Sequence, residues 1–298
     1  LLGCHPDEIL FTSGGSEANN LALKGYCLAH RERGNHLIVS AVEHPAVMEV
    51  ARHLVSRGFE LTILPVDGYG MVSPADVAAA LRPDTLLVSV MHANNEVGTI
   101  EPIADLAAIA HAHGALFHCD AAQSAGKIPV NVDELGVDLL SIAGHKLYAP
   151  KGIGCLYVRR GVTLEKQIHG ANHERDLRAG TENMLEIAGL GAACRIAARD
   201  LETLSARMAA QRDRLWEGLG ARLDGLFEDF LGRRAQFVVN VLGRNAYTRV
   251  DALVPGQSQG IGGHVDVFFH GAGQRTNRRG RNGLRNLEYG VEVSGAGN

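Results

Sequence analysis

The most constraining feature of this sequence is a regular alternation of short apolar runs with helix-like segments. The apolar runs are rich in β-branched residues and lie at 37–40, 61–66, 85–91, 115–120, 139–143 and 153–158. Helix-like segments lie between most of them, and two end in a glycine, as helices commonly do. Strands that alternate with helices predict an α/β fold with a mostly parallel sheet between helices. In such sheets ligands bind at the carboxyl ends of the strands, so we expect functional residues directly after these runs.

Composition restricts the partners. The 298 residues suffice for one large core and a smaller domain, as in a soluble globular protein. A formal net charge of −4 provides no basic surface, so we expect neither nucleic acid nor membrane as a partner. No apolar run approaches roughly 18 residues and no signal segment is apparent, which predicts a cytoplasmic location. The first residue is not Met, and we expect that an N-terminal part of the large domain precedes it.

The cysteines predict free thiols. There are five, at widely spaced positions without a C-x-x-C pair: Cys4, Cys27, Cys119, Cys155 and Cys194. An odd number at such spacing argues against a disulfide framework and against a zinc cage.

The C-terminal third differs from the rest in composition and in hydrophobic periodicity. Residues 181–226 have a helical pattern, with a long amphipathic helix within 201–223. We predict a large domain over 1–198, and over 199–298 a long helix followed by a small domain that is incomplete or aberrant. Residues 227–298 are rich in Gly, Arg and Asn with little periodicity, so their fold is not predicted. Both a reading-frame shift and divergence remain open as their origin.

A glycine-rich turn follows the first short strand, in "FTSGGSEANN" (residues 11–20). The amides of Gly15 and Ser16, at the start of a helix, could hold a phosphate because the helix N-terminus is partly positive. The alternative is an ordinary N-capped helix.

Three further strand-like runs are each followed by polar groups. Asp120 ends the run at 115–120, and a buried carboxylate there requires a cationic or strongly donating partner, for which a protonated pyridine nitrogen is one candidate. His44 precedes a Pro that favours a helix start, and its imidazole could stack on a flat ring or transfer protons. Asn95 could donate to a phenolate-like oxygen. For each, a structural role is the alternative: an N-cap for Asp120, a structural histidine for His44 and an Asn-rich turn for Asn95.

Lys146 follows a fifth run, in "SIAGHKLYAPKG" (residues 141–152). A lysine there could be a surface charge, a phosphate contact or the covalent anchor of an aldehyde. Together with a phosphate cradle, a carboxylate and flat-ring contacts, it predicts a site for pyridoxal 5′-phosphate, in which the lysine amine forms a Schiff base.

Six blocks in order carry a resemblance to a known family: "SGGSEANNLALKG", "EHPAV", "MHANNEVGTIEPI", "HCDAAQSAGKIPV", "SIAGHKLYAPKGIGCLYVRRG" and "HERDLRAGTEN". They resemble the motifs of the cysteine desulfurases, class V members of the fold-type I pyridoxal phosphate enzymes. The resemblance covers roughly residues 1–225. It implies a large fold-type I domain, a homodimer with the site at the interface, and L-cysteine as substrate.

The resemblance also implies roles for single residues. Lys146 would form the Schiff base and His44 would stack on the ring and act in proton transfer, which makes these two the expected catalytic residues. Asp120 would lie on the ring nitrogen, with Asn95 and Gln123 near the ring hydroxyl. The phosphate would be held by Gly15, Ser16 and His145, and by Thr181 from the partner subunit, and Ala143 and Gly144 are further expected cofactor-binding residues. Ala143 departs from the family, in which many relatives have a phosphate-binding Ser.

The implied activity is conversion of L-cysteine to L-alanine with sulfur transfer for iron–sulfur cluster assembly, with a scaffold or sulfur-acceptor protein as partner. In this family a loop about a hundred residues after the lysine carries the cysteine that attacks the substrate sulfur. No cysteine follows Cys194 here, so we expect little or no turnover by this chain. The alternatives are another class V enzyme (an aminotransferase or β-eliminating lyase), a non-catalytic remnant, and a metal hydrolase using His111 and His113. No metal site is predicted, because those two histidines would point to different helix faces.

Overall fold

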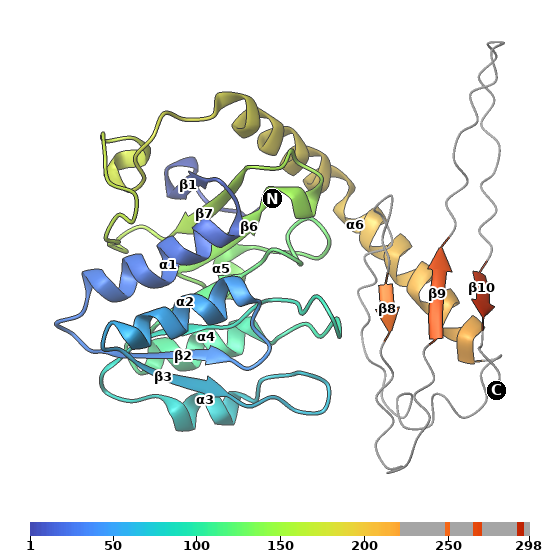
Figure 1. Ribbon diagram of the computed structural model, residues 1–298, viewed down its shortest axis with the longest axis horizontal. Helices are drawn as coiled ribbons and strands as arrows, with labels where there is room; N and C mark the ends of the chain where they lie inside the picture. Colours follow the sequence, from blue (N-terminus) through green and yellow to red (C-terminus); the bar gives the residue numbers. More distant parts are fainter. Residues whose placement is uncertain (221–247, 251–264, 270–290, 295–298) are drawn as a thin grey trace. The chain divides into compact units, whose positions relative to one another are not determined.

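The computed structural model describes residues 1–220, 248–250, 265–269 and 291–294 (Figure 1). The chain divides into two compact units, Leu1–Val239 and Asn240–Asn298. The predicted boundary after residue 198 stays a prediction. Most of the segment 227–298, for which no fold was predicted, lies outside the described residues, and so does the end of the predicted helical region, 221–226.

The first unit contains a seven-stranded sheet in the order β1-β7-β6-β5-β4-β2-β3. Its strands are β1 (Ile9–Thr12), β2 (His36–Ser40), β3 (Glu60–Leu64), β4 (Thr85–Ser89), β5 (Leu116–Asp120), β6 (Leu139–Ala143) and β7 (Gly154–Val158). The pairs β2–β3, β2–β4, β4–β5 and β5–β6 are parallel, and β7 is antiparallel to both β6 and β1. The prediction of an α/β fold with a mostly parallel sheet is therefore confirmed.

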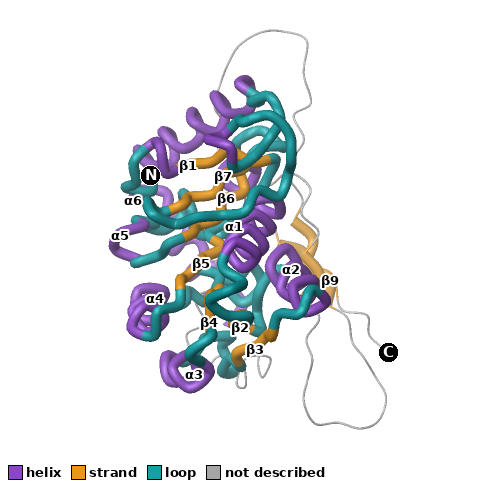
Figure 2. Tube along the Cα trace, turned by 90° about the vertical axis from the view of Figure 1, so that its left-hand side faces the viewer, coloured by secondary structure: helices purple, strands orange, loops and turns teal. Residues whose placement is uncertain are grey.

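Helices cover both faces of this sheet (Figure 2). They are α1 (Gly15–Ala29), α2 (Pro45–Ser56), α3 (Pro74–Ala80), α4 (Ile103–Ala112), α5 (Val132–Leu135) and the long α6 (Met184–Gly220). Successive strand residues point to opposite faces, so Leu37 packs in the core under α1 and α2, while Ile38 packs in the core under α4. Within the described part of the chain, no helix is long and apolar enough to cross a membrane.

The second unit contains a three-stranded antiparallel sheet in the order β10-β9-β8. Its strands are β8 (Thr248–Val250), β9 (Val265–Phe269) and β10 (Val291–Ser294). These strands fall in the segment whose pattern predicted no fold.

The topology of the first unit brings five strand ends to one edge of the sheet. The parallel strands β2, β4, β5 and β6 end there, and β1 also ends there because two antiparallel pairings through β7 restore its direction. Thr12 at the end of β1 and Ala143 at the end of β6 both pair with Gly154. Apart from Thr181, which follows no strand, the residues predicted for the site therefore follow strands that end on the same side.

Candidate functional site

The turn between β1 and α1 presents free backbone donors. Gly14 has φ 156° and ψ −179°, a conformation essentially restricted to glycine, and no side chain caps the helix that starts at Gly15. First-turn N–H groups have no partner within a helix, and in the described part of the chain no acceptor meets those of Gly15 and Ser16. A Cβ on Gly15 would lie 3.1 Å from the Cβ of Ala143, so the turn packs directly on the end of β6. The N-cap residue is Gly14, which has no side chain to cap the helix, so the free amides leave room for an anion at this turn.

Asp120 ends β5 as a buried carboxylate with no cation in hydrogen-bond contact among the described residues. Its Oδ2 accepts from Asn19 Nδ2 at 2.8 Å, and its Oδ1 accepts from the N–H of Ala122 at 2.9 Å. Burial raises its pKa above the ordinary value, although these hydrogen bonds and the nearby His44 and Lys146 oppose the rise. A cationic N–H donor at the remaining lone pairs would restore the charged form.

Lys146 lies on a short 3₁₀ turn, η2 (Gly144–Leu147), that directly follows β6. A Cβ on Gly144 would approach the carbonyl oxygen of Ile153 to 2.7 Å, so only glycine fits at the start of the turn. Tyr148 ends it with φ 64°, a strained conformation for a residue with a side chain. The turn is in contact with α6. It holds the half-buried Lys146 close enough that the lysine charge lowers the pKa of both Asp120 and His145. Burial is the largest cause lowering the pKa of the exposed His145, followed by Lys146, Lys151 and Lys127.

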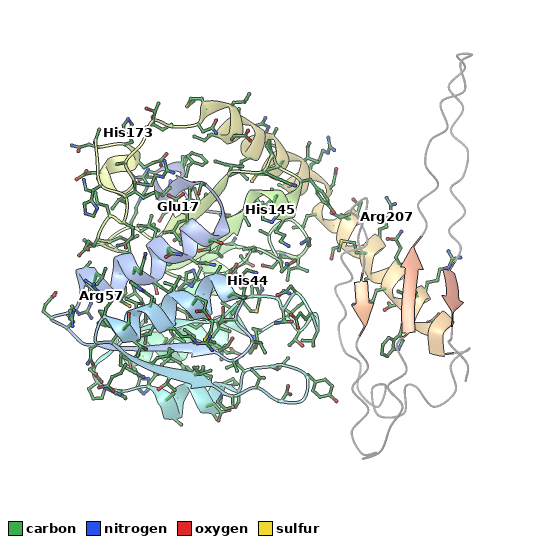
Figure 3. The ribbon with its side chains drawn as sticks, viewed as in Figure 1. Glu17, His44, Arg57, His145, His173 and Arg207 are labelled. Carbon is green, nitrogen blue, oxygen red and sulfur yellow. The ribbon has the colours of Figure 1, made fainter. Side chains whose placement is uncertain are left out.

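His44 caps α2 and lies exposed at the end of the β2 connection, on the same side of the unit as His145 (Figure 3). Its Nδ1 accepts a hydrogen bond from the N–H of Ala46 at 3.1 Å. In the neutral ring the proton therefore resides on Nε2, which has no partner among the described residues. The ring can act as a cap and as a proton donor at the same time.

The two asparagines after β4 have different tasks. Asn94 is buried and shapes the loop, since its Oδ1 accepts from the N–H groups of Glu96 and Val97. Asn95 is exposed, and within the described residues its amide has no partner. Asn94 thus has the structural role in the turn, and the predicted contact of Asn95 with a ring oxygen stays a prediction.

Gln123 lies half-buried on the turn after Asp120. Its Oε1 accepts from Lys127 Nζ at 3.3 Å, so its Nε2 faces away from the lysine. Lys127 itself is 4 % exposed, and burial lowers its pKa to about 8, with Lys146 adding to the effect.

Thr181 is exposed and makes no hydrogen bond within the described part of the chain. The segment before it is held at α1 by Arg178, whose Nε donates to Glu17 Oε1 at 2.8 Å. Burial alone would raise the pKa of Glu17, but hydrogen bonds from Arg178 and Ser13 lower it. This ion pair was not predicted, although both residues lie in the conspicuous motifs.

Sequence reasoning also missed a group of buried ionisable side chains near Asp120. Glu43 Oε1 accepts from Ser40 Oγ at 2.6 Å and from the N–H of Met91 at 2.7 Å, while its Oε2 has no partner among the described residues. Burial raises the pKa of Glu43 to about 8 and that of Glu101 to about 7. The raised pKa favours the neutral form of Glu43, which limits the negative charge near Asp120. The only hint in the sequence was a Glu directly before His44.

The residues of the metal-hydrolase alternative have other partners. His111 Nε2 lies 2.7 Å from Asp138 Oδ2, and His113 Nδ1 lies 3.0 Å from the carbonyl oxygen of Ile109. Among the described residues, no group of three or more His, Cys, Asp or Glu side chains could hold a metal ion.

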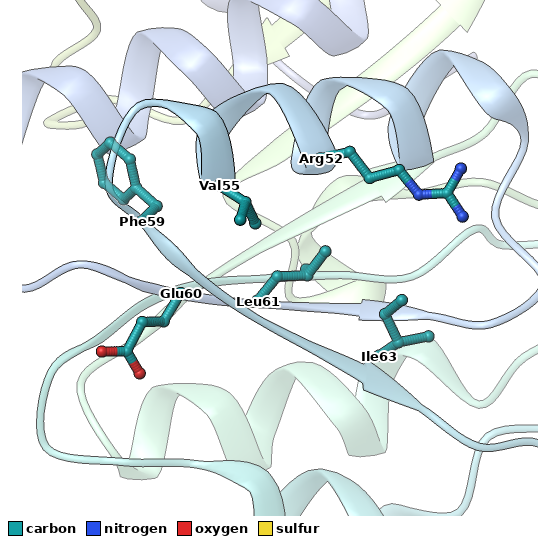
Figure 4. A pocket seen from close by; sticks show the side chains of 6 residues that line it. All are labelled: Arg52, Val55, Phe59, Glu60, Leu61 and Ile63. Atoms are coloured by element: carbon teal, nitrogen blue, oxygen red, sulfur yellow. The ribbon is translucent and has the colours of Figure 1, made fainter.

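A separate hollow lies between α2 and the edge strand β3, away from the strand ends (Figure 4). It is lined by Arg52, Val55, Phe59, Glu60, Leu61 and Ile63. None of these residues belongs to the predicted site.

The arrangement fits pyridoxal 5′-phosphate on three observations. The free amides of Gly15 and Ser16 suit a phosphate, the buried Asp120 suits a ring nitrogen that carries a proton, and Lys146 lies near enough to Asp120 to affect its pKa. The structure thus brings Gly15, Ala143, His44, Asp120 and Lys146 to one edge. It places Asn95 and Gln123 on neighbouring loops and Thr181 on the surface.

Comparison with known proteins agrees with this geometry. The aminotransferase class-V family matches residues 1–228. A cysteine desulfurase IscS from Dictyoglomus turgidum is 52% identical over 212 residues, which cover 71% of this chain and 54% of that protein. The chain therefore spans about half the length of this curated relative.

Two solved structures are similar to the fold. One is a NifS-like protein with a TM-score of 0.71 and 40% identity, over 73% of this chain and 60% of that one. The other is SspA in complex with cysteine, with a TM-score of 0.63 and 45% identity, over 65% of this chain and 56% of that one.

Proposed function

Since the chain belongs to the aminotransferase class-V family and is a cysteine desulfurase family member by similarity, we propose that it binds pyridoxal 5′-phosphate covalently through Lys146. The single observation that carries this proposal is that Lys146, on the turn after β6, lies at the same edge of the sheet as the buried Asp120, which ends the neighbouring parallel strand β5. Among the described residues this carboxylate has no cationic partner in hydrogen-bond contact, and the lysine is held on a strained turn close by. When bound, the cofactor withdraws electrons from the α-carbon of an amino acid.

Each residue of the site has a definite task in this proposal. Asp120 would accept a hydrogen bond from the protonated ring nitrogen and keep that nitrogen charged. Asn19 Nδ2 and the N–H of Ala122 donate to the carboxylate and hold it in place. The amides of Gly15 and Ser16 bind the phosphate. His44, anchored through Nδ1, holds its proton on Nε2, where it can be delivered to the substrate and replaced from solvent.

We propose L-cysteine as the substrate class, because the similar SspA structure contains cysteine and the IscS relative is a cysteine desulfurase. We further propose a homodimer in the cytoplasm that serves iron–sulfur cluster assembly through a scaffold or sulfur acceptor. The dimer is supported by Thr181, which is exposed, and by the neighbouring Met184 and Leu185, which are 68% and 79% exposed.

Sulfur transfer requires a reactive thiolate, and none of this chain's five cysteines supplies one. Cys27, Cys119 and Cys155 are buried, and burial raises the pKa of each. Burial likewise raises the pKa of the two half-buried thiols, Cys4 and Cys194. Because the thiolate is the nucleophile, we propose that this chain binds the cofactor but has little or no desulfurase turnover.

The test is to measure alanine and persulfide formation from cysteine by this chain and by a variant whose residues 227–298 are replaced by a family-like loop carrying a cysteine. We expect turnover only in the variant. Robust turnover by the unmodified chain, abolished by mutating one of its five cysteines, would contradict the proposal.

A further inference from the structure

We propose that Lys127 is a positioning residue that fixes the side-chain amide of Gln123 with its NH₂ group toward the cofactor. This inference rests on the proposed function, because it concerns the same site. No sequence motif pointed to a role for Lys127, because it does not follow a strand end with a Gly-His pair as Lys146 does.

The burial of Lys127 is the first argument. Its side chain is on the turn after β5, and the residue is 4 % exposed, although an ammonium group is strongly hydrated at a surface. Among the described residues, the one acceptor its Nζ meets is Gln123 Oε1, at 3.3 Å. A buried ammonium group without a hydrogen-bond acceptor would destabilise the fold. The Gln123 oxygen is therefore held facing Nζ.

The chemistry of the two groups sets the direction of the amide. An ammonium group has three donors and no acceptor, so only the oxygen of an amide can face it. The two ends of a Gln amide have nearly the same shape, and without a fixed partner either can face a ligand. Lys127 removes this ambiguity: with Oε1 turned toward Nζ, Nε2 is the end left for the site.

The orientation matters because the ring of the cofactor carries a phenolate-like oxygen, which accepts hydrogen bonds. An amide turned the other way would present an oxygen to that oxygen and repel it. Lys127 also lies close to two other basic groups: the charge of Lys146 lowers the pKa of Lys127, and the charge of Lys127 lowers the pKa of His145. Its positive charge therefore acts on the same region as its hydrogen bond.

The experiment compares Lys127→Met with Lys127→Arg in the full chain loaded with pyridoxal 5′-phosphate. The readout is the pH midpoint at which the visible absorbance of the bound cofactor changes. Loss of a donor to the ring oxygen concentrates negative charge there and strengthens proton binding at the linkage to Lys146. We expect Lys127→Met to raise the midpoint by about 0.5–1 pH unit, the equivalent of one hydrogen bond, and Lys127→Arg to leave it unchanged.

A double-mutant cycle separates positioning from a direct charge effect. If Lys127 acts through Gln123, its replacement by Met gives a clearly smaller shift on a Gln123→Ala background, where only the effect of the lost charge remains. The other titratable groups near the site, Lys146, His145, His44, Asp120 and Glu43, are the same in all variants. An equal shift in both backgrounds would overturn the positioning role, and so would an unchanged midpoint in Lys127→Met.

Should Lys127→Met not fold, Gln123→Glu tests with Lys127 intact the premise that the end of the Gln123 side chain left by Lys127 is a donor to the ring oxygen. Its carboxylate can accept from Nζ but offers no donor to the ring oxygen, so we expect a rise at least as large. No change would overturn the inference. Failure of the proposed function has a different signature: the parent chain itself would show no bound chromophore, and the role of Lys127 would fall with it.

Discussion

Replacing Glu43 by Gln should make the cofactor-free chain progressively more stable than the parent as the pH rises. The folded-state pKa of Glu43 is raised to about 8 by burial, from an ordinary value of 4.5. Between these two values the unfolded chain has released the proton that the folded chain retains. The parent therefore loses stability as the pH increases through this window, by at most about 1.4 kcal/mol per pH unit.

The glutamine side chain of the variant keeps an oxygen for the donors Ser40 Oγ and Met91 N–H but cannot ionise. Any fixed cost of its NH₂ group is the same at every pH, and the titrations of the other buried groups occur in both proteins. The difference in the free energy of unfolding should therefore grow by about 2–3 kcal/mol between pH 5 and pH 7 in favour of the variant.

Urea unfolding of both proteins at pH 5, 6, 7 and 8 measures this difference. Glu49→Gln, at an exposed position on α2, is the matched control and should follow the parent at each pH. Parallel stability curves for Glu43→Gln and the parent would refute the reasoning, because they would show that Glu43 ionises equally in the folded and unfolded chains.

Three other changes test the frame of the site. Gly154→Ala would place a Cβ 2.6 Å from the backbone of Gly14, and we expect a loss of at least about 2 kcal/mol in urea unfolding. A double-mutant cycle of Glu17→Gln with Arg178→Leu should give a coupling energy of about 1–2 kcal/mol, because the pair is mostly buried; additive losses would contradict the ion pair. Thr181→Val should weaken cofactor binding together with dimerisation, measured by cofactor titration and light scattering across protein concentrations. A monomer with full, concentration-independent occupancy would argue against that role.

The sheet and its site edge could be predicted because local patterns specify them. Apolar runs bounded by turn residues mark the strands, and strand ends are where polar residues such as Asp120 stand out. The strand boundaries differ by a residue or two: the run at 61–66 is strand only to Leu64, since Pro65 follows, and Val90 and Met91 lie beyond the end of β4. The start of α2 at Pro45 is as predicted.

The rest depends on contacts between distant segments, which no local pattern reveals. Glu43 meets Met91 only because β2 and β4 are neighbours, and Asn19 reaches Asp120 across 101 residues. Glu17 and Arg178 are separated by 161 residues. Lys127 and Gln123 are only four residues apart, but the sequence did not show that Lys127 is buried, and its proposed role depends on that burial.

The most direct test of the account is to reduce the cofactor-loaded chain with borohydride and map the labelled peptide. Borohydride makes the link between cofactor and lysine permanent, so the label reports which amine holds the cofactor. We predict label on Lys146, because it alone among the lysines lies on the turn after β6, next to Asp120. Label on Lys127 or Lys151 with none on Lys146 would contradict the account.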